Sequence, residues 1–485
     1  MRRSTVPIAA RVQLRIALSL AIVVAGCEPS PREAPRSAVL VTLDTTRADA
    51  LGCYGGAADT SPRIDAFAAG SVRFARAHTV APLTLPAHAS LLTGLFPLRH
   101  GVRDNGRNPL PETAVSVAEV ASDSGLQTAA FVSAAVLSRG FGLAQGFDIY
   151  RAPGDTGAAH TSSFPSRTAA DTVSRAATWL RSRDRERGFL LWVHLWEPHA
   201  PYDPPSGFER SNPYLGEIAA ADDAFGRLVD ALSEQGLDAS TTIVLVADHG
   251  EAFGEHGERS HGALCFSPTL RVPLIVRTPG VAAAVDDRIV SVADVAPTLL
   301  ASLGLPVPRG LDGRDLAGEI DAEAGVYFES LQGWYLYGWS PVRGWIDRSG
   351  KFWQGGRERF FDPVDDPSES RDLLASGADA VKLAATIERV RASLEQLSAK
   401  PRLQPDAPVN PELRDMVEAL GYAVAAEGGE DPEADIGRLP DPADRIAELD
   451  RVHRISNLGN RAKFAEAAEL CEQILGENPG NLWAL

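Results

Sequence analysis

Thr84 carries a hydroxyl at a position where it could react with a bound anionic group. Thr84 is followed by Pro86 and by an apolar run that continues at helical spacing. Because proline fits the first turn of a helix, the pattern places Thr84 at or just before a helix N-terminus. The free N–H groups and partial positive charge of that end suit an anion such as phosphate or sulfate. An ordinary N-cap threonine is the alternative interpretation of this stretch.

Acidic and histidine residues follow three apolar, β-branched runs that are typical of buried strands. The three runs and the polar residues after them are residues 38–43 with Asp44, residues 189–196 with Glu197 and His199, and residues 241–247 with Asp248 and His249. Parallel strands bring their carboxyl ends to one edge of an α/β sheet, where such proteins bind ligands. We therefore expect these side chains to converge, although each of them could be an ordinary loop residue.

Strands and helices alternate along the first 300 residues, which predicts a doubly wound, mostly parallel α/β domain. Further strands are expected at 128–132 and 273–276, and helices at 117–124, 169–181, 218–232 and 292–303. From about Ala324, aromatic segments separated by Gly and Asp turns predict a small antiparallel subdomain. A helix is expected at 380–397, and a helix pair at 444–458 and 461–475.

The N-terminus has the pattern of a secretory signal. Four arginines precede a short apolar run, residues 16–25, that is too short to span a bilayer comfortably. The sequence Val24-Ala-Gly-Cys27 resembles a bacterial lipobox, which implies cleavage before Cys27 and lipidation of that cysteine. We expect a membrane-anchored lipoprotein of the bacterial cell envelope, on the periplasmic side or at the cell surface. An ordinary signal peptide with an incidental cysteine is the alternative.

Charge and cysteine content exclude several classes of protein. The net charge of −17 argues against nucleic acid as a partner and against a simple electrostatic hold on anionic lipid. Cys53, Cys265 and Cys471 show no CxxC spacing, so a zinc ribbon or a thioredoxin-like motif is not expected. Whether Cys53 and Cys265 form a disulfide stays open from the sequence.

The ordered set of motifs resembles the sulfatases and their relatives in the alkaline phosphatase superfamily. The matching segments are residues 43–55, 84–94, 197–202, 248–251 with 254–257, 270–276 and 362–373. Each segment alone is weakly specific, but together and in this order they are highly specific. The resemblance spans about residue 38 to about residue 400 and implies an alkaline-phosphatase-like fold.

The resemblance also implies roles for individual residues. Asp44, Asp248 and His249 look like ligands of one divalent cation, Ca²⁺, Mn²⁺ or Zn²⁺, which the nucleophile at Thr84 would also reach. His199 and His261 match positions that bind the anionic group of the substrate or protonate the leaving oxygen. Asn105 resembles an oxyanion-holding residue of nucleotide pyrophosphatase/phosphodiesterases, which share the Thr-x-Pro-x-His pattern. His88, the last residue of that pattern, is assigned with Asn105 to substrate binding.

The departures from the family's pattern concern the chemistry. Standard sulfatases have Cys or Ser at the position of Thr84, and that residue is oxidised to formylglycine. Oxidation of a secondary alcohol would give a ketone, so this route should be closed here. His88 replaces the usual Arg, and Thr45 replaces a second Asp. Lipoteichoic acid synthases and phosphoethanolamine transferases have such a Thr with one metal, and the Asp-x-x-x-His pair of two-zinc phosphodiesterases is not found.

Three hypotheses follow. The first is an extracytoplasmic, metal-dependent hydrolase or transferase that cleaves phosphate or sulfate esters through a metal-activated Thr84, with phospho-transfer favoured. The second is a catalytically inactive sulfatase-fold binding protein that displays a repeat domain. The third is a true sulfatase that uses Thr84 directly. The intact metal and nucleophile positions favour an enzyme, and the organic part of its anionic ester substrate cannot be inferred.

The expected division of the chain has six parts. They are a signal peptide (1–27), a tether (28–37), a catalytic domain (38–323), its C-terminal subdomain (324–400), a linker (401–440) and a partial tetratricopeptide-like repeat (441–485). The repeat is suggested by the spacing of small and large apolar residues in the last helix pair, for which a plain helical hairpin is the alternative. This tail is a candidate surface for a protein partner.

Overall fold

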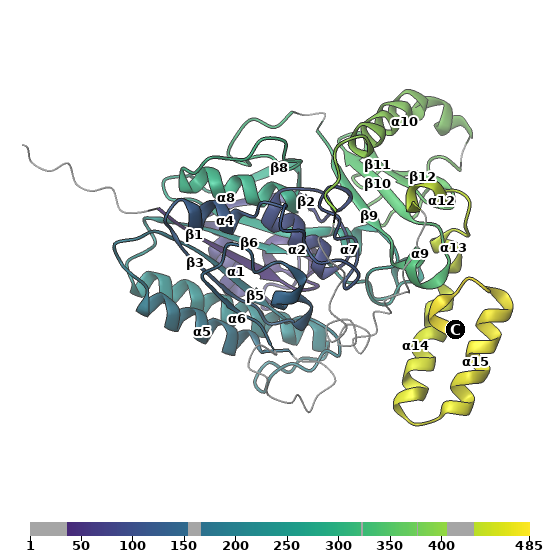
Figure 1. Ribbon diagram of the computed structural model, residues 1–485, viewed down its shortest axis with the longest axis horizontal. Coiled ribbons are helices and arrows are strands. Elements are labelled where there is room, and N and C mark those ends of the chain that lie inside the picture. The colour runs from purple at the N-terminus through teal and green to yellow at the C-terminus, as the bar shows by residue number, and fades with distance from the viewer. Residues whose placement is uncertain (1–35, 154–165, 322–323, 376, 405–430) are drawn as a thin grey trace, which may run out of the picture. The chain divides into compact units, whose positions relative to one another are not determined.

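A mostly parallel sheet organises the N-terminal part of the fold. The computed structural model describes residues 36–153, 166–321, 324–375, 377–404 and 431–485 (Figure 1). The sheet has eight strands, in the spatial order β4 (Ile149–Arg151), β3 (Gln127–Phe131), β5 (Phe189–Leu195), β1 (Ser37–Leu43), β6 (Thr241–Ala247), β7 (Arg271–Arg277), β2 (Val72–His78) and β8 (Ala284–Ser291). Only β7 runs against the others, since it pairs antiparallel with both β6 and β2.

The three central strands carry the apolar runs noted in the sequence. Every residue of β5, β1 and β6 is buried, as expected for strands that are covered on both faces. The register aligns Leu43 with Leu195 on one side and with Ala247 on the other. The residues that directly follow these three strands therefore lie side by side at one edge of the sheet.

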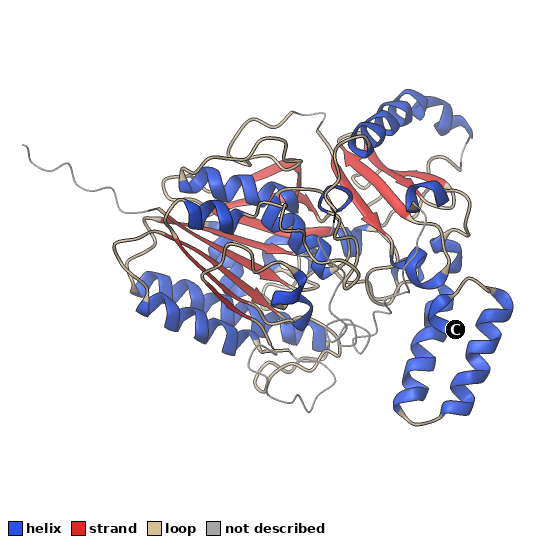
Figure 2. Cartoon of the chain, viewed as in Figure 1, coloured by secondary structure: helices blue, strands red, loops and turns tan. Residues whose placement is uncertain are grey.

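Helices cover both faces of the sheet (Figure 2). One layer contains α1 (Pro62–Ala69), α5 (Ala169–Ser182) and α6 (Pro213–Glu234), and the other contains α2 (Thr84–Thr93), α4 (Val117–Asp123) and α8 (Val295–Leu303). This arrangement confirms the doubly wound α/β fold class. The helix expected at 292–303 begins with a 3-10 turn, Val292–Asp294, because the Ser291 side chain caps that turn.

Strands β2 and β8 are absent from the sequence-based expectation. β2 contains two arginines and has several half-exposed residues, and β8 lies at the edge of the sheet with its first half exposed. Neither strand therefore shows a continuous apolar run or a clean alternation. Short helices that also carry weak sequence signals are α3 (Pro97–His100), α7 (Ser267–Leu270) and the 3-10 turns Ala48–Ala50, Gly52–Tyr54, Ala135–Leu137, Arg139–Phe141, Glu255–Gly257 and Leu482–Ala484.

A second, antiparallel sheet confirms the small subdomain expected after residue 324. Its four strands are, in order, β12 (Glu358–Phe361), β11 (Gly350–Gln354), β10 (Val342–Asp347) and β9 (Val326–Ser330). The helix α9 (Gln332–Tyr337) follows β9, and the long helix α10 (Gly377–Ser398) packs against β10. Aromatic residues contribute to the core of this subdomain: Phe328 on β9, Trp353 on β11 and Trp339, between α9 and β10, are fully buried.

The C-terminal helix pair packs on this subdomain. α14 (Ala447–Asn460) and α15 (Phe464–Glu477) lie against each other, and their apolar residues share a core with β9–β12. The Asn478 side chain donates to the carbonyl of Tyr337 at 2.7 Å, which ties the end of α15 to α9. The helix pair is thus observed, while its identity as a tetratricopeptide-like repeat stays a prediction.

Other expectations about the chain's organisation can be compared with the described residues only in part. The expected signal peptide with Cys27, and most of the tether, lie outside these residues. In the expected linker, 401–440, the described ends are bonded to the fold, and they include α12 (Pro432–Asp435), which precedes α13 (Pro442–Arg445). Cys53 and Cys265 are free thiols. No described helix has the length and apolarity needed to cross a membrane.

Candidate active site

Two carboxylates and an imidazole meet at the carboxyl ends of β1 and β6. One donor atom from each of Asp44, Asp248 and His249 lies within 4.8 Å of the others, and all three side chains are fully buried. Nε2 of His249 is 3.8 Å from Oδ1 of Asp44 and 3.7 Å from Oδ2 of Asp248. The convergence expected from the strand register is therefore present for these three residues.

The hydrogen bonds around Asp44, Asp248 and His249 leave at least one donor atom of each side chain available to bind a cation. Oδ1 of Asp248 accepts the backbone N–H groups of His249 and Thr45, at 2.7 and 3.2 Å, and Oδ2 has no hydrogen-bond partner among the described residues. Nδ1 of His249 donates to the carbonyl of Gly250 at 2.9 Å, so its Nε2 carries a lone pair. In the part of the chain that the structure describes, neither oxygen of Asp44 has a hydrogen-bond partner.

This donor set fits a divalent cation. Burial raises the pKa of Asp44, and burial together with the charge of Asp44 raises the pKa of Asp248 well above its usual value. Two neighbouring buried carboxylates, three of whose oxygens accept no hydrogen bond from the described residues, are costly unless a positive charge lies between them. Carboxylate oxygens and a neutral imidazole nitrogen are ligands that suit Ca²⁺, Mn²⁺ and Zn²⁺ alike. Asp44, Asp248 and His249 are thus the residues that would hold the ion.

Thr84 lies next to this group, as the first residue of α2. Its Oγ1 is 3.4 Å from Nε2 of His249, and the residue is 2% exposed. All ten residues of α2 are buried, and the helix packs against α3, α4, α8 and the 3-10 turn Val292–Asp294. The hydroxyl therefore sits both at a helix N-terminus, as the sequence predicts, and beside the candidate metal ligands.

Asn105 lies against the same helix end. Its Oδ1 accepts the backbone N–H of Leu85 at 2.8 Å, which fixes the orientation of the amide. Its Nδ2 is buried and has no hydrogen-bond partner among the described residues. A buried N–H donor without a partner is costly, so this amide is suited to bind an oxygen of a group held at Thr84.

His88 lies one helical turn after Thr84, and its side chain is bonded to the backbone of Thr84. Its Nδ1 donates to the carbonyl of Thr84 at 2.8 Å, and its Nε2 lies 3.0 Å from Oγ1 of Thr42. Burial lowers the pKa of the ring to about 3, so it is neutral. Because both ring nitrogens are engaged, the geometry favours a supporting role, and direct contact between His88 and a substrate stays a prediction.

His261 is oriented by a carboxylate. Its Nδ1 lies 3.0 Å from Oε1 of Glu251, whose Oε2 accepts the Tyr202 hydroxyl at 2.7 Å. Burial opposes the charged form of His261, but the charge and hydrogen bond of Glu251, together with the charges of Asp44 and Glu258, outweigh burial and raise the pKa of the ring. The centroid of the ring is 4.5 Å from that of His249. His261 is thus suited to donate a proton beside the candidate metal ligands.

His199 has the opposite electrostatic character. Burial lowers the pKa of its ring, which stacks on Trp196 with 3.9 Å between the ring centroids. Its Nδ1 donates to the carbonyl of Ala200 at 2.7 Å, and its backbone N–H donates to Glu217 at 3.0 Å. The ring centroid lies 5.6 Å from that of His261. Neighbouring histidines whose pKa values are pushed apart are a frequent feature of acid–base sites.

Two residues of this site were missed by sequence reasoning. Nε2 of His194 lies 3.4 Å from Oδ2 of Asp44, and its Nδ1 accepts the backbone N–H of Ser133 at 3.4 Å. A histidine inside the apolar run of β5 was the available signal. Glu251 belongs to the Asp-His-Gly-Glu segment, but nothing in the sequence shows that its carboxylate meets His261.

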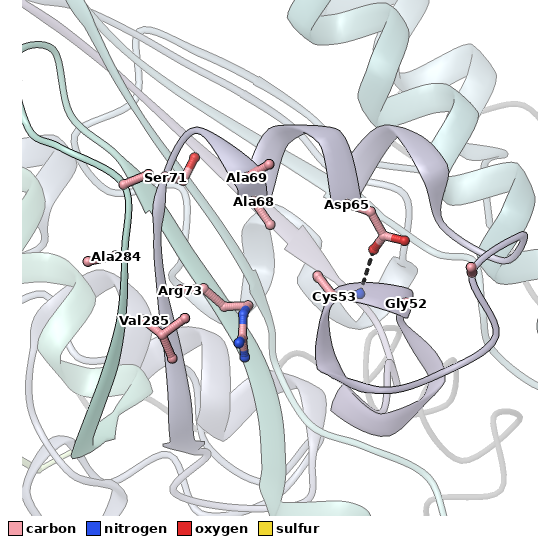
Figure 3. A pocket seen from close by; sticks show the side chains of 11 residues that line it. Gly52, Cys53, Asp65, Ala68, Ala69, Ser71, Arg73, Ala284 and Val285 are labelled. Atoms are coloured by element: carbon pink, nitrogen blue, oxygen red, sulfur yellow. Dashed lines mark hydrogen bonds between the residues drawn. The ribbon is translucent and has the colours of Figure 1, made fainter.

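The pocket in Figure 3 lies elsewhere. It has a volume of about 500 Å³ and is lined by residues of α1, of the preceding loop and of β2 and β8, including Asp65 and Arg73. Burial and the charge of Asp65 raise the pKa of the Cys53 thiol to about 12, so this thiol is a poor nucleophile. None of the site residues named above lines this pocket.

Solved structures share this fold. A protein in complex with its substrate D-glucosamine-2-N,6-O-disulfate has a TM-score of 0.65 at 19% identity, over 77% of this chain and 99% of its own. The phosphonate monoester hydrolase of Agrobacterium radiobacter has a TM-score of 0.60 at 21% identity, over 75% of this chain and 96% of its own. Both likenesses concern the fold alone.

Sequence comparison identifies the family. The ulvan-active sulfatase of Formosa agariphila is 26% identical over 393 residues, which cover 69% of this chain and 76% of that protein. The family model described as "Sulfatase" matches residues 36–305, more than half of the chain and the part that carries Thr84 and the candidate metal ligands. The chain therefore belongs to the sulfatase family of ester hydrolases.

Proposed function

We propose that this chain is a metal-dependent enzyme that cleaves phosphate or sulfate esters with Thr84 as its nucleophile. The observation that carries the proposal is the position of the Thr84 hydroxyl, 3.4 Å from Nε2 of His249 at the first turn of a buried helix. When bound to Asp44, Asp248 and His249, a divalent cation supplies positive charge that favours the anionic form of a nearby hydroxyl. The helix N-terminus acts in the same direction.

The residues suggest a reaction in two steps. Oγ1 of Thr84 releases its proton to solvent and attacks the phosphorus or sulfur atom, and the bond to the leaving oxygen breaks as the new bond forms. His261, held by Glu251, gives a proton to the leaving oxygen. Water, or another alcohol, then displaces the group from Thr84 and restores the hydroxyl. Nδ2 of Asn105 donates to an oxygen of the transferred group in both steps.

The charges at the site favour a singly charged group. The strongest charge interactions of Asp44 and of His249 are with histidines and, for Asp44, Glu251, and no described Lys or Arg is among them. Two carboxylates and one divalent cation cancel, and the charge of His261 is matched by Glu251. A phosphodiester or a sulfate ester, each carrying one negative charge, therefore suits the site better than a phosphate monoester with two.

The choice between phosphorus and sulfur rests on the nucleophile. The formylglycine of standard sulfatases forms an aldehyde hydrate, which expels sulfate by elimination. Threonine cannot form this hydrate, so a phosphoryl or sulfuryl group on Thr84 must be removed by a second displacement. Phospho-transfer through a covalent threonine ester proceeds by two displacements and needs no modified residue. The fold likeness to a phosphonate monoester hydrolase supports this preference, while the sulfated compounds named for other relatives support sulfate esters.

Three chromogenic esters test the proposal. With Ca²⁺, Mn²⁺ or Zn²⁺ added, we expect kcat/KM to be highest for bis-p-nitrophenyl phosphate, lower for p-nitrophenyl sulfate and lowest for p-nitrophenyl phosphate, which is doubly charged above neutral pH. A preference for the sulfate ester would assign the chain to direct sulfate-ester cleavage by Thr84. Failure to turn over any of the three would favour the alternative of an inactive binding protein.

We also propose that the protein acts in the bacterial cell envelope, anchored by a lipid on Cys27. The support is the charged N-terminus followed by Val24-Ala-Gly-Cys27. The variant Cys27→Ala should leave an unprocessed or a soluble protein, because the acylated residue is lost. Membrane fractionation and the mass of the N-terminal peptide check this, and a soluble cytoplasmic wild type with an intact Met1 would disprove it.

A further inference from the structure

The segment that carries Asn105 has no regular secondary structure of its own. Residues 101–111 contain no helix or strand, so side-chain contacts must set their shape. Oδ1 of Asp104 accepts the backbone N–H groups of Gly106 and Arg107, at 3.2 and 2.8 Å, and closes a turn around Asn105. This turn needs to be held against α2 for the Asn105 amide to reach the N–H of Leu85.

Arg103 supplies that anchor, two residues before Asn105. Its side chain is 11% exposed and pairs with two carboxylates. Nε lies 2.8 Å from Oε1 of Glu329 on β9, and Nη2 lies 2.8 Å from Oε1 of Glu433 on α12. Burial raises the pKa of Glu433, but the charge and hydrogen bond of Arg103, together with a hydrogen bond from Asp431 and the charge of Arg402, lower it to about 2. A largely buried guanidinium that is bonded to two carboxylates has little freedom to move.

Glu433 is itself fixed from several directions. Its second oxygen accepts from Nη1 of Arg402 at 3.1 Å. Two residues later, Oδ2 of Asp435 accepts the indole N–H of Trp334 at 3.0 Å, which ties α12 to α9. These two contacts span 31 and 101 residues of sequence, whereas the contact between Arg103 and Glu433 spans 330. Both Glu329 and Glu433 lie outside the residues matched by the sulfatase family model, 36–305.

We propose that Glu433 is a positioning residue, which acts through Arg103 to hold the Asn105 amide at the N-terminus of α2. Glu433 belongs to the described end of segment 401–440, which the sequence predicts to be a linker after the C-terminal subdomain, and through Arg103 it supports the donor set around Thr84. The inference rests on the proposed function only in the role given to Asn105. The geometric part of it, that Glu433 fixes the 101–107 turn, stands apart from any activity.

A double-mutant cycle tests the path from Glu433 to Asn105. Glu433→Gln removes the negative charge that pairs with Arg103, so the turn that carries Asn105 is held less firmly. We expect kcat to fall roughly tenfold while KM and metal content stay near wild type. In an Asn105→Ala background the same substitution should change kcat little, because its effect passes through the missing amide. Equal losses in the two backgrounds, or no loss in the wild-type background, would overturn the proposal.

Arg402→Gln is the matched control. It removes the partially exposed partner of the same carboxylate and leaves the contact with Arg103 in place. We expect near wild-type kcat, and a loss as large as that of Glu433→Gln would contradict a path through Arg103.

Hydrogen exchange separates this inference from the proposed function. In Glu433→Gln, but not in Arg402→Gln, peptides that contain Leu85 and residues 101–107 should exchange faster than in the wild type. Unchanged exchange there would overturn the positioning role. If no ester is turned over by the wild type, the proposed function fails, and faster exchange would still establish the role of Glu433.

Discussion

Thr84→Ala should lose about three orders of magnitude or more in kcat on every ester that the wild type turns over. The substitution removes the attacking atom and leaves Asp44, Asp248 and His249 in place. Metal content should therefore remain close to that of the wild type. Steady-state kinetics and elemental analysis of the same preparation measure both quantities.

Thr84→Ser is the control for this prediction. It keeps the hydroxyl at the first position of α2 and removes only a methyl group, so part of the activity should remain. If Thr84→Ala turns over an active ester at a rate near that of the wild type, Thr84 is not the nucleophile. The inactive binding protein, or a different site, would then become the better interpretation.

Asp248→Ala should abolish metal binding and activity together. Oδ2 of Asp248 is one of the inward-facing oxygens without a hydrogen-bond partner, and its loss leaves Asp44 and His249 as the remaining ligands. A cation at about a hundredfold excess over its dissociation constant stabilises a folded protein by about 2.7 kcal/mol. Addition of metal should thus raise the melting temperature of the wild type and leave that of Asp248→Ala unchanged.

Asp49→Ala is a matched control for the metal site. Asp49 follows β1, as Asp44 does, but its carboxylate is exposed and pairs with Arg47. This variant should bind one equivalent of metal and show the wild-type thermal response. Active wild-type protein without metal would contradict the assignment, and two tightly bound equivalents would favour a phosphodiesterase-like site with two ions.

The parts of the site that follow buried strands can be predicted from the sequence. Asp44 and Asp248 come directly after continuous apolar runs, and parallel strands in register must bring such residues to one edge. Thr84 is marked in a similar way by Pro86 and the helix that follows. These inferences need only local pattern and the geometry of a parallel sheet.

The rest of the site depends on contacts between distant segments. The pairing of Glu251 with His261 depends on the path of the loop between them. The approach of His194 on β5 to Asp44, which follows β1, depends on the register between these two strands. Glu433 meets Arg103 across 330 residues. No local pattern in the sequence encodes such a meeting, so a segment rich in Pro, Glu and Asp is naturally interpreted as a linker.

A covalent intermediate on Thr84 is the central claim, and trapping it is the most direct test. Metal-loaded protein turning over bis-p-nitrophenyl phosphate is quenched with acid, digested and mapped by mass spectrometry. The account predicts a phosphoryl ester on the peptide that contains Thr84, absent from the same peptide of Thr84→Ala. For an active sulfate ester, it predicts a sulfuryl group at the same position. Turnover with an unmodified Thr84, or with the group on another residue, would contradict the account.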